Sequence, residues 1–282
     1  MTASNKERRE AKALDDRELE VEMANLRAWN YWGRKWSLHN KKIPLESRTS
    51  CLMKTRAATY QRAYQKMVLS IQGLGGKSVL DIGCGTSDYQ KWLASDCKRL
   101  VGVDISVEML KLCREDRGKS IELVAADALH LPFKSECFDA STTFQALHHF
   151  PNYKKALTEM IRTSKQIVLY EPNRESILHR LLHFIRQTFH VEQRFKQISE
   201  DYGLVEFNAS GFSSREITFF LQKRGLSTTL FMFGLVPVAL LAKVSTLSPR
   251  FMFLLLGIED LVGRLPVLRN QLGGMLVAGS KK

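Results

Sequence analysis

Two glycines and two acids stand at positions where a parallel sheet could hold a small molecule. Gly83 and Gly85 lie in the stretch DIGCG, where the lack of a Cβ atom lets the backbone approach a ligand closely. Asp104 follows 21 residues after Gly83, the separation at which an acid at the tip of the next strand reaches a ribose diol. Asp127 closes a third apolar run. Together these residues predict a nucleoside pocket lined with hydrogen-bond acceptors.

The neighbouring residues narrow the class of ligand. A dinucleotide site would have a third glycine where Asp88 stands, and a carboxylate there opposes a pyrophosphate but tolerates a cationic or zwitterionic ligand. The stretch GGKS at 75–78 resembles part of a phosphate loop, but the first glycine of that motif would fall on Ile71, and GKS leads into a strand pattern instead of a helix. We therefore interpret GLGGK as a turn between a helix and a strand, and DIGCG as the ligand-binding turn.

Short apolar runs alternate with amphipathic segments of helical length from Val79 onward, and these elements would position the pocket. The expected strands are 78–83, 99–105, 121–127, 138–144 and 166–171. The expected helices are 87–96, 106–118 and 152–164, with Ser106 and Asn152 as N-caps. This repeat predicts a parallel sheet covered on both faces, which binds ligands at the carboxyl ends of its strands.

The alternation of strands and helices ends after residue 171. Residues 175–196 have the pattern of a basic amphipathic helix, and residues 213–225 are expected to form a helix that ends at Gly225. Two more strands are expected at 226–233 and 273–282, with an apolar insert between them. The chain therefore combines a sheet domain with two added segments.

Five stretches resemble one known family. SVLDIGCGTSDY, GVDIS, AADALHLPF, FDASTTFQALHHF and GGMLVAGSKK closely resemble class I S-adenosylmethionine-dependent methyltransferases, in the type 11 branch similar to ubiquinone and menaquinone biosynthesis methyltransferases. The resemblance covers residues 56–171 and, more loosely, 211–282. It implies an α/β fold with a doubly wound, seven-stranded, mostly parallel sheet of the Rossmann-like methyltransferase type. It also implies S-adenosylmethionine as the cofactor.

The domain limits follow from this resemblance. We expect a basic, aromatic helical segment over residues 1–55 and a methyltransferase domain over 56–282. Helical inserts are expected at about 173–210 and 234–270.

The resemblance assigns the cofactor to residues at or just after the carboxyl ends of four of the expected strands. These residues are Asp81, Gly83, Gly85, Asp104, Ile105, Asp127, Ala128 and Gln145. Those of the glycine turn would hold the methionine end, and the acid of the second strand would bind the ribose. Ile105 would lie beside the adenine, and the pair after the third strand would contact the adenine amino edge and ring. The family usually has glycine where Ser87 stands, and serine is small enough that we expect binding to survive.

Methyl transfer from a sulfonium needs alignment of donor and acceptor and exclusion of water, and it needs a base only if the acceptor holds a proton. His148 and His149 follow the fourth strand and are the candidates for such a base, although related sequences commonly carry histidines here without an established base role. His179 and His183 are spaced like metal ligands, but the sequence HRLLH lacks the glutamate of a zinc motif. We therefore expect no metal site.

The acceptor would be selected by the flanking segments. Five aromatic residues before the first strand could form its wall: Trp29, Tyr31, Trp32, Trp36 and Tyr60. The same cluster could instead lie at a lipid headgroup layer or cover the core. The insert 234–270 holds apolar runs shorter than the ~20 residues that span a bilayer, so it is either a buried helical cap or a surface for an isoprenoid or lipid acceptor.

Charge and cysteine content bear on partners and compartment. The net charge is +13, divided as +7, +1 and +5 over residues 1–70, 71–170 and 171–282. The basic flanks would attract nucleic acid, anionic lipid or acidic substrates. The five cysteines form no CxxC pair, and the N-terminus has no apolar signal core, which predicts a cytoplasmic protein. Peripheral membrane contact stays open.

The predicted function is transfer of a methyl group from S-adenosylmethionine to a small, hydrophobic or lipid-linked acceptor, such as a quinone-like molecule. An RNA or protein methyltransferase is the alternative. Nucleic acid is disfavoured because QALHH stands where amino-group methyltransferases of bases have an NPPY-type tetrad. A subunit that binds the cofactor without catalysis is disfavoured by the acids at 81, 104 and 127. Oligomeric state, and the choice among oxygen, nitrogen and carbon as the methylated atom, are not determined by the sequence.

Overall fold

The protein is described by a computed structural model. The structure describes residues 63–71, 73–85, 89–117, 121–176, 210–233 and 272–281, with isolated residues 20, 23, 26, 27, 29–31, 34, 180, 208 and 265. The predicted segment 1–55 and the predicted inserts 173–210 and 234–270 lie almost wholly outside these residues.

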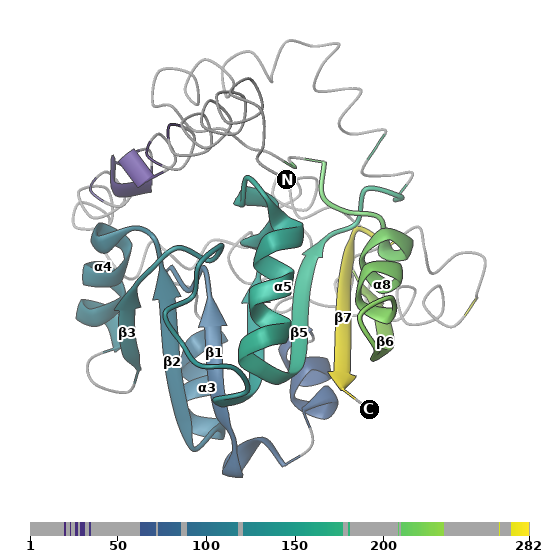
Figure 1. Ribbon diagram of the computed structural model, residues 1–282, viewed down its shortest axis with the longest axis horizontal. Coiled ribbons are helices and arrows are strands. Elements are labelled where there is room, and N and C mark those ends of the chain that lie inside the picture. The colour runs from purple at the N-terminus through teal and green to yellow at the C-terminus, as the bar shows by residue number, and fades with distance from the viewer. Residues whose placement is uncertain are drawn as a thin grey trace, which may run out of the picture.

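The described chain builds one seven-stranded sheet in the order β3-β2-β1-β4-β5-β7-β6 (Figure 1). Its strands are β1 (Ser78–Ile82), β2 (Arg99–Asp104), β3 (Glu122–Ala125), β4 (Phe138–Phe144), β5 (Ser164–Pro172), β6 (Leu226–Phe233) and β7 (Gly274–Lys281). All neighbouring pairs run parallel except β7, which is antiparallel to both β5 and β6. The order reverses between β1 and β4, and such a reversal opens a crevice at the carboxyl ends of the two strands.

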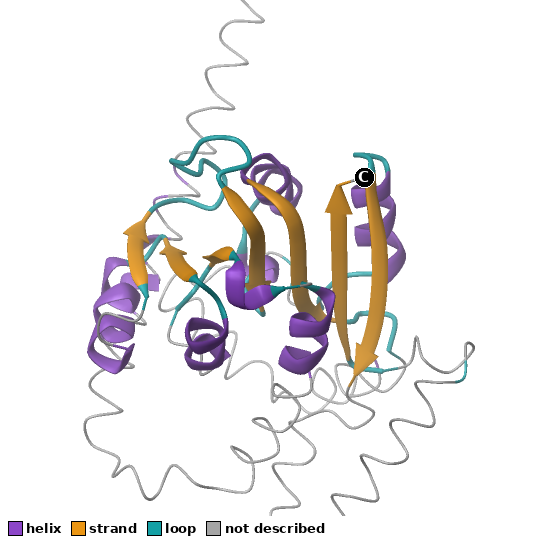
Figure 2. Ribbon diagram, turned by 90° about the horizontal axis from the view of Figure 1, so that it is seen from below, coloured by secondary structure: helices purple, strands orange, loops and turns teal. Residues whose placement is uncertain are grey.

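Helices cover both faces of the sheet (Figure 2). They are α3 (Tyr89–Asp96), α4 (Val107–Arg117), α5 (Tyr153–Thr163) and α8 (Ser214–Gln222), and residues 63–70 are also helical. One core contains the apolar sides of α5 and α8, and the other contains residues 63–71, α3 and α4. Because side chains alternate along a strand, Val79 of β1 enters the second core and Leu80 enters the first.

The predicted α/β fold, with its doubly wound and mostly parallel sheet, is confirmed. Strands 138–144 and 226–233 have the predicted bounds, while β3 is shorter than the predicted 121–127. It ends early because the Asp127 carboxylate accepts a hydrogen bond from the Leu129 amide at 2.9 Å, which turns the chain. The turn assigned to GLGGK is also confirmed, since Gly73 has φ 69° and a short 3₁₀ helix (Leu74–Gly76) follows it.

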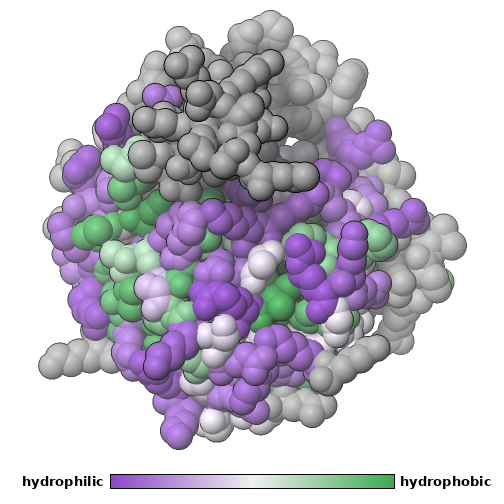
Figure 3. All heavy atoms as spheres, viewed as in Figure 1, coloured by the Kyte–Doolittle hydropathy of each residue, from purple (hydrophilic) through white to green (hydrophobic). Residues whose placement is uncertain are grey.

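The two predicted helix caps are present. The Ser106 hydroxyl accepts a hydrogen bond from the Met109 amide at 3.2 Å, and the Asn152 side chain accepts one from the Lys155 amide at 3.1 Å. These bonds satisfy backbone donors that the first turn of a helix leaves unpaired. On the face shown in Figure 3 most of the described surface is hydrophilic. Among the described residues, no helix is long and apolar enough to cross a membrane.

Candidate active site

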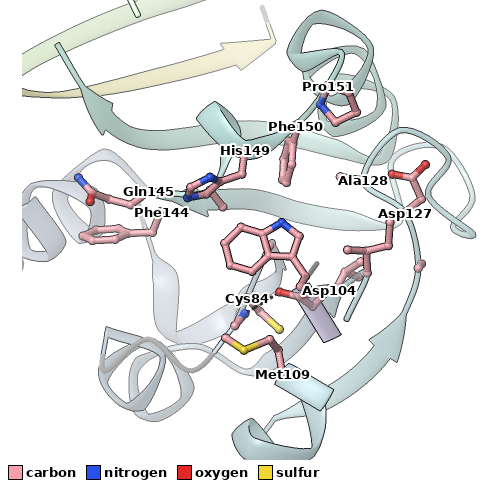
Figure 4. Close-up of a pocket in the computed structure, with 17 residues that line it drawn as sticks. Cys84, Asp104, Met109, Asp127, Ala128, Phe144, Gln145, His149, Phe150 and Pro151 are labelled. Carbon is pink, nitrogen blue, oxygen red and sulfur yellow. Dashed lines mark hydrogen bonds between the residues drawn. The ribbon is translucent and has the colours of Figure 1, made fainter. Parts of the chain in front are cut away.

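A cavity of about 210 Å³ lies at the carboxyl ends of β1, β2 and β4 (Figure 4). In that view, Asp104 and Met109 lie across the cavity from His149 and Phe150. The residues around it come from the N-terminal segment, four strand ends with the turns that follow them, and the start of α4: Trp29, Gly83, Cys84, Gly85, Val103, Asp104, Ile105, Met109, Ala126, Asp127, Ala128, Phe144, Gln145, Ala146, His149, Phe150 and Pro151. The strand ends that the sequence predicts to meet therefore do meet at one cavity.

The glycine turn after β1 forms the floor of the cavity. Gly83 has φ 67° and Gly85 has φ 46°, conformations that strain any residue with a Cβ atom. A Cβ atom at Gly83 would lie 2.5 Å from the Cβ atom of Ala146, which follows β4. Glycine at 83 therefore allows the chains after β1 and β4 to approach each other.

Asp104 connects the glycine turn to the tip of β2. Its carboxylate accepts hydrogen bonds from the Gly85 amide at 3.0 Å and the Ser106 amide at 2.9 Å, one on each oxygen. Burial raises the pKa of Asp104 above the ordinary value of an aspartate, although the two backbone bonds act in the opposite direction. Each oxygen has a second lone pair available for a ligand hydroxyl.

Apolar side chains line the cavity near Asp127. They include Ile105 and Ala128, and the Asp127 side chain itself remains partly exposed. Met109 lies beside the glycine turn, where its Cε would be 3.5 Å from a Cβ atom at Gly85. A flat aromatic group fits between aliphatic side chains of this kind, and a carboxylate at its edge would accept a hydrogen bond from an amino group. This arrangement suits a nucleoside base.

Asp81 does not line the cavity. It is completely buried, and its carboxylate accepts hydrogen bonds from Gln90 of α3 at 2.8 Å and from the Thr142 hydroxyl at 3.1 Å. The Gln90 amide also donates to the carbonyl of Cys84, inside the glycine turn. Asp81 therefore positions Gln90, and Gln90 in turn holds the glycine turn. The Asp81 side chain itself does not face the cavity.

The segment after β4 forms the roof of the cavity. Gln145 has φ 56°, a left-handed conformation that costs roughly 1–3 kcal/mol and is concentrated at functional sites. Its amide donates to the carbonyl of Tyr170 at 2.8 Å. The buried Glu171 carboxylate accepts from the amides of Ala146 and Leu147 at 3.0 and 2.8 Å. These bonds hold the segment against the end of β5.

The two candidate histidines have different surroundings. His148 places Nδ1 2.6 Å from Oε2 of Glu171. His149 lines the cavity, where desolvation and then the neighbouring His148 lower its pKa to about 3. The Trp29 ring meets the His149 ring edge-on, with centroids 4.8 Å apart. His149 is therefore a neutral, packed side chain at physiological pH.

The N-terminal segment is joined to the domain beside Trp29. The Asn30 side-chain oxygen accepts hydrogen bonds from the Ser106 hydroxyl at 2.9 Å and the Glu108 amide at 3.3 Å, at the start of α4. Among the predicted acceptor residues, Trp29 lies at the cavity, and Tyr31 is described but does not line it.

Other predicted positions lie outside the described residues. They are Trp32, Trp36, Tyr60, Ser87, Asp88, His179 and His183. Within the described part of the chain, no group of three or more His, Cys, Asp or Glu side chains could hold a metal ion.

Two polar residues that organise the site were not identified from the sequence. Gln90 has no motif of its own and becomes visible only when α3 packs on β1. Glu171 could have been noticed, because it is an acid near the end of an expected strand next to the one that precedes the histidines.

Comparison with known proteins gives a family match for the central strands. Residues 80–167 match the family model described as a methyltransferase domain. An uncharacterized protein of Methanocaldococcus jannaschii is 36% identical over 132 residues, which cover 45% of this chain and 50% of that protein. The demethylmenaquinone methyltransferase of Thermobifida fusca is 34% identical over 105 residues, 36% of this chain and 44% of that enzyme. The chain thus spans about half the length of the curated relatives it matches.

Solved structures share the fold. An S-adenosylmethionine-dependent methyltransferase from Mesorhizobium loti aligns with a TM-score of 0.54 at 13% identity, over 80% of this chain and 100% of that one. The YcgJ protein from Bacillus subtilis aligns with a TM-score of 0.52 at 18% identity, over 79% of this chain and 99% of that one. At these identities the likeness extends to the fold alone.

Proposed function

We propose that this chain transfers a methyl group to a small, hydrophobic acceptor of the quinone-like or lipid-linked kind. The premise is that the chain belongs to the class I S-adenosylmethionine-dependent methyltransferase family. The observation that carries the proposal is the position of the Asp104 carboxylate. It joins the glycine turn to an apolar half-cavity, which is the arrangement a nucleoside with a charged tail requires.

The described residues fit S-adenosylmethionine. Asp104 would accept hydrogen bonds from the ribose hydroxyls, and the apolar end near Ile105 and Ala128 would hold the adenine. Gly83 and Gly85 would present backbone to the methionine end, where a cation is compatible with the nearby carboxylates. Bound there, the sulfonium supplies an activated methyl group.

The chain's own contribution is alignment and exclusion of water. Gln145 and the residues after it are held rigidly by Tyr170 and Glu171, so they can form a fixed wall at the reacting end. Trp29 and Phe150 add apolar surface to the same cavity. A fixed geometry of this kind favours in-line transfer because it removes the entropic cost of aligning the reactants.

The proposed acceptor class is based on the aromatic residues of the cavity and on the relatives of this chain. The cavity walls at Trp29, Phe144 and Phe150 are aromatic, which suits a planar apolar acceptor. Several curated relatives are demethylmenaquinone methyltransferases, at 34–35% identity. A quinone-like acceptor is therefore the specific form of the proposal.

Cofactor use is tested by calorimetry with S-adenosylmethionine and S-adenosylhomocysteine. We expect both to bind, and Asp104→Asn to weaken both by at least about tenfold, because a hydrogen bond to a charged group contributes roughly 1.5–3 kcal/mol. Glu122→Gln is the matched control, since Glu122 lies on β3 and is exposed in a pair with Arg99. Equal affinities for the wild type and the Asp104 variant would refute the ribose assignment.

The acceptor is tested by transfer of labelled methyl groups into a cell extract that is then separated into lipid, small-molecule, RNA and protein fractions. We expect the label in the lipid or small-molecule fraction, and less of it with Trp29→Ala than with Trp29→Phe. Label confined to RNA or protein would replace this acceptor class with the alternative one.

A further inference from the structure

The connection from β3 to β4 is a loop whose backbone needs partners from elsewhere. All of residues 126–137 are described, and they join the two strands without a helix. The two strands point the same way, so the loop must run back from the carboxyl end of β3 to the start of β4. A helix would pair its own backbone groups, whereas a loop that packs on the domain has to find other donors and acceptors.

Two side chains of α5 supply these partners. Arg162 donates through Nη1 to the Phe133 carbonyl at 2.7 Å and through Nη2 to the Leu131 carbonyl at 3.0 Å. The Glu159 carboxylate accepts a hydrogen bond from the Leu131 amide at 2.9 Å. Farther along the loop, the Glu136 amide donates to the Arg162 carbonyl at 2.9 Å. Both backbone groups of Leu131 are therefore paired with side chains of α5.

Glu159 and Arg162 also hold each other in place. They are three residues apart, which puts them on one face of the helix. Nε and Nη2 of Arg162 each donate to a different oxygen of Glu159 at 2.7 Å, a two-point contact that fixes the plane of the guanidinium. The hydrogen bonds from Arg162 hold the pKa of Glu159 below its ordinary value. The side chains are 17% and 34% exposed, so the pair is partly shielded from water.

The loop that this pair holds begins at the cavity. Asp127 and Ala128 line the cavity, and Figure 4 shows both on the side away from Gln145. The Asp127 carboxylate accepts a hydrogen bond from the Leu129 amide at 2.9 Å. Leu129 and Leu131 are both buried in the core that contains α5. Because only two residues separate Ala128 from Leu131, a shift at Leu131 would move the Asp127 carboxylate.

A second link from α5 reaches Asp127 through a histidine. Nζ of Lys155 lies 2.6 Å from Nε2 of His130, and Nδ1 of His130 lies 3.4 Å from the Asp127 carboxylate. An ammonium only donates and a carboxylate only accepts, so both contacts select the tautomer with hydrogen on Nδ1. The His130 side chain is 61% exposed, so solvent weakens this link. The main constraint on the loop is therefore the pair of Glu159 and Arg162.

We propose that Glu159 and Arg162 are positioning residues for the base of the cofactor, because they fix the loop that brings Asp127 and Ala128 to the cavity. The inference rests on the proposed use of S-adenosylmethionine and deepens it. Asp127 would accept a hydrogen bond from the adenine amino group, whereas a carbonyl oxygen at the same place would set two acceptors against each other. The pair therefore controls the preference for adenine over hypoxanthine, although neither side chain lines the cavity.

A preference of this kind depends on precise placement. A hydrogen bond weakens steeply as its length and angle depart from the optimum. The contact of a base with apolar side chains such as Ile105 is not directional, so it tolerates small shifts. A loosened loop should therefore still bind the nucleoside but lose its preference for adenine. A role in stability alone would leave that preference unchanged in protein that remains folded.

The test is calorimetry with S-adenosylhomocysteine and S-inosylhomocysteine, whose bases differ at the amino group. The wild type should bind the adenosine form at least about tenfold more tightly, the effect of one hydrogen bond to a charged group. In Arg162→Lys and in Glu159→Gln the ratio should fall to about threefold or less. A lysine cannot reach Glu159 and both carbonyls at once, and a glutamine replaces one acceptor by a donor.

Two further variants are controls for this ratio. Arg99→Lys is matched to Arg162→Lys, since Arg99 makes the same two-point contact with Glu122, at 2.8 and 2.7 Å, on β2 and β3. It should keep the wild-type ratio. Asp127→Asn is the positive control, because its amide can donate to the carbonyl of the inosine form. In that variant the ratio should fall to about one or reverse.

The possible failures are distinguishable. If Arg162→Lys and Glu159→Gln melt as folded proteins and keep the wild-type ratio while Asp127→Asn changes it, the positioning role is refuted and the cofactor assignment stands. An equal fall in Arg99→Lys, or an unchanged ratio in Asp127→Asn, also refutes the positioning role. If the wild type binds neither ligand, the proposed function fails, and this inference fails with it.

Hydrogen exchange of the free wild type needs no variant. The Leu131 amide should exchange at least about 10²-fold more slowly than an unstructured amide, because it donates to the Glu159 carboxylate. In Arg162→Lys, where the carboxylate loses its fixed partner, the same amide should exchange faster. Exchange of the wild-type amide at the unstructured rate would overturn the proposal, since the pair would then not hold the loop.

Discussion

Gln90 of α3 donates a 2.8 Å hydrogen bond to the carboxylate of Asp81 in β1, and both side chains are completely buried. The same Gln90 amide donates to the Cys84 carbonyl, and its oxygen accepts from the Cys113 thiol. Gln90 therefore couples a buried charge to the shape of the ligand-binding turn. A change at this one polar side chain should therefore affect both the stability of the sheet and the shape of the cavity.

Gln90→Leu is expected to destabilise the protein by roughly 1.5–3 kcal/mol, because it removes one donor from a buried carboxylate that keeps its bond from Thr142. Urea denaturation followed by circular dichroism measures this loss. In Asp81→Asn/Gln90→Leu the charge is gone, so the double variant should be less destabilised than the sum of the two single variants. Additive losses would show that the two side chains are not coupled.

Gly83→Ala should be much more damaging than Gly73→Ala. Both glycines have a similar positive φ, 67° and 69°, but a Cβ atom at Gly73 meets nothing within 4 Å, whereas one at Gly83 collides with Ala146. Gly73→Ala should lose about 1 kcal/mol of stability from backbone strain alone. Gly83→Ala should lose more and also bind S-adenosylmethionine weakly, as measured by thermal unfolding and calorimetry. Equal effects would mean that the contact between the two loops does not matter.

The affinity for S-adenosylmethionine should fall in acid earlier than an ordinary aspartate would predict. Burial raises the pKa of Asp104 above 3.8, so its carboxylate becomes protonated, and loses an acceptor for the ribose, at a higher pH. Calorimetric affinities measured from pH 7 down to pH 4 should decrease in the wild type. Asp104→Asn has no carboxylate to protonate at this position. Its affinity for S-adenosylmethionine should therefore be lower at pH 7 but should change less as the pH falls.

His149 should make folding stability depend on pH. Its pKa falls from 6.5 to about 3 on folding, so below pH 6.5 the unfolded chain takes up a proton that the folded chain does not. Neutral His149 therefore adds at most about 5 kcal/mol to the free energy of unfolding, and this contribution is fully present above pH 6.5. It is lost as the pH falls toward 3. His149→Phe should show a smaller decrease in melting temperature between pH 7 and pH 4 than the wild type. An identical decrease would mean that His149 is protonated in the folded protein.

Much of the fold could be predicted because it depends on local pattern. The runs that became β4 and β6 are apolar, short and bounded by turn residues, so their limits were correct to the residue. β3 was predicted too long because the Asp127 side chain caps the chain after Ala125, a contact that apolar periodicity does not reveal. The positions of Gly83 and Asp104 in the cavity followed from their place at strand ends, since parallel strands bring their carboxyl ends to one edge.

By itself, the sequence determined the order of strands and helices, the family resemblance, and which glycines and acids meet at one cavity, because these depend on periodicity and on spacing along the chain. Only the tertiary structure decided what Asp81, His148 and His149 do. Asp81 is paired by Gln90, His148 by Glu171, and His149 is packed against Trp29. The protonation and orientation of a side chain depend on the groups that surround it in space, and those groups come from elements distant in sequence.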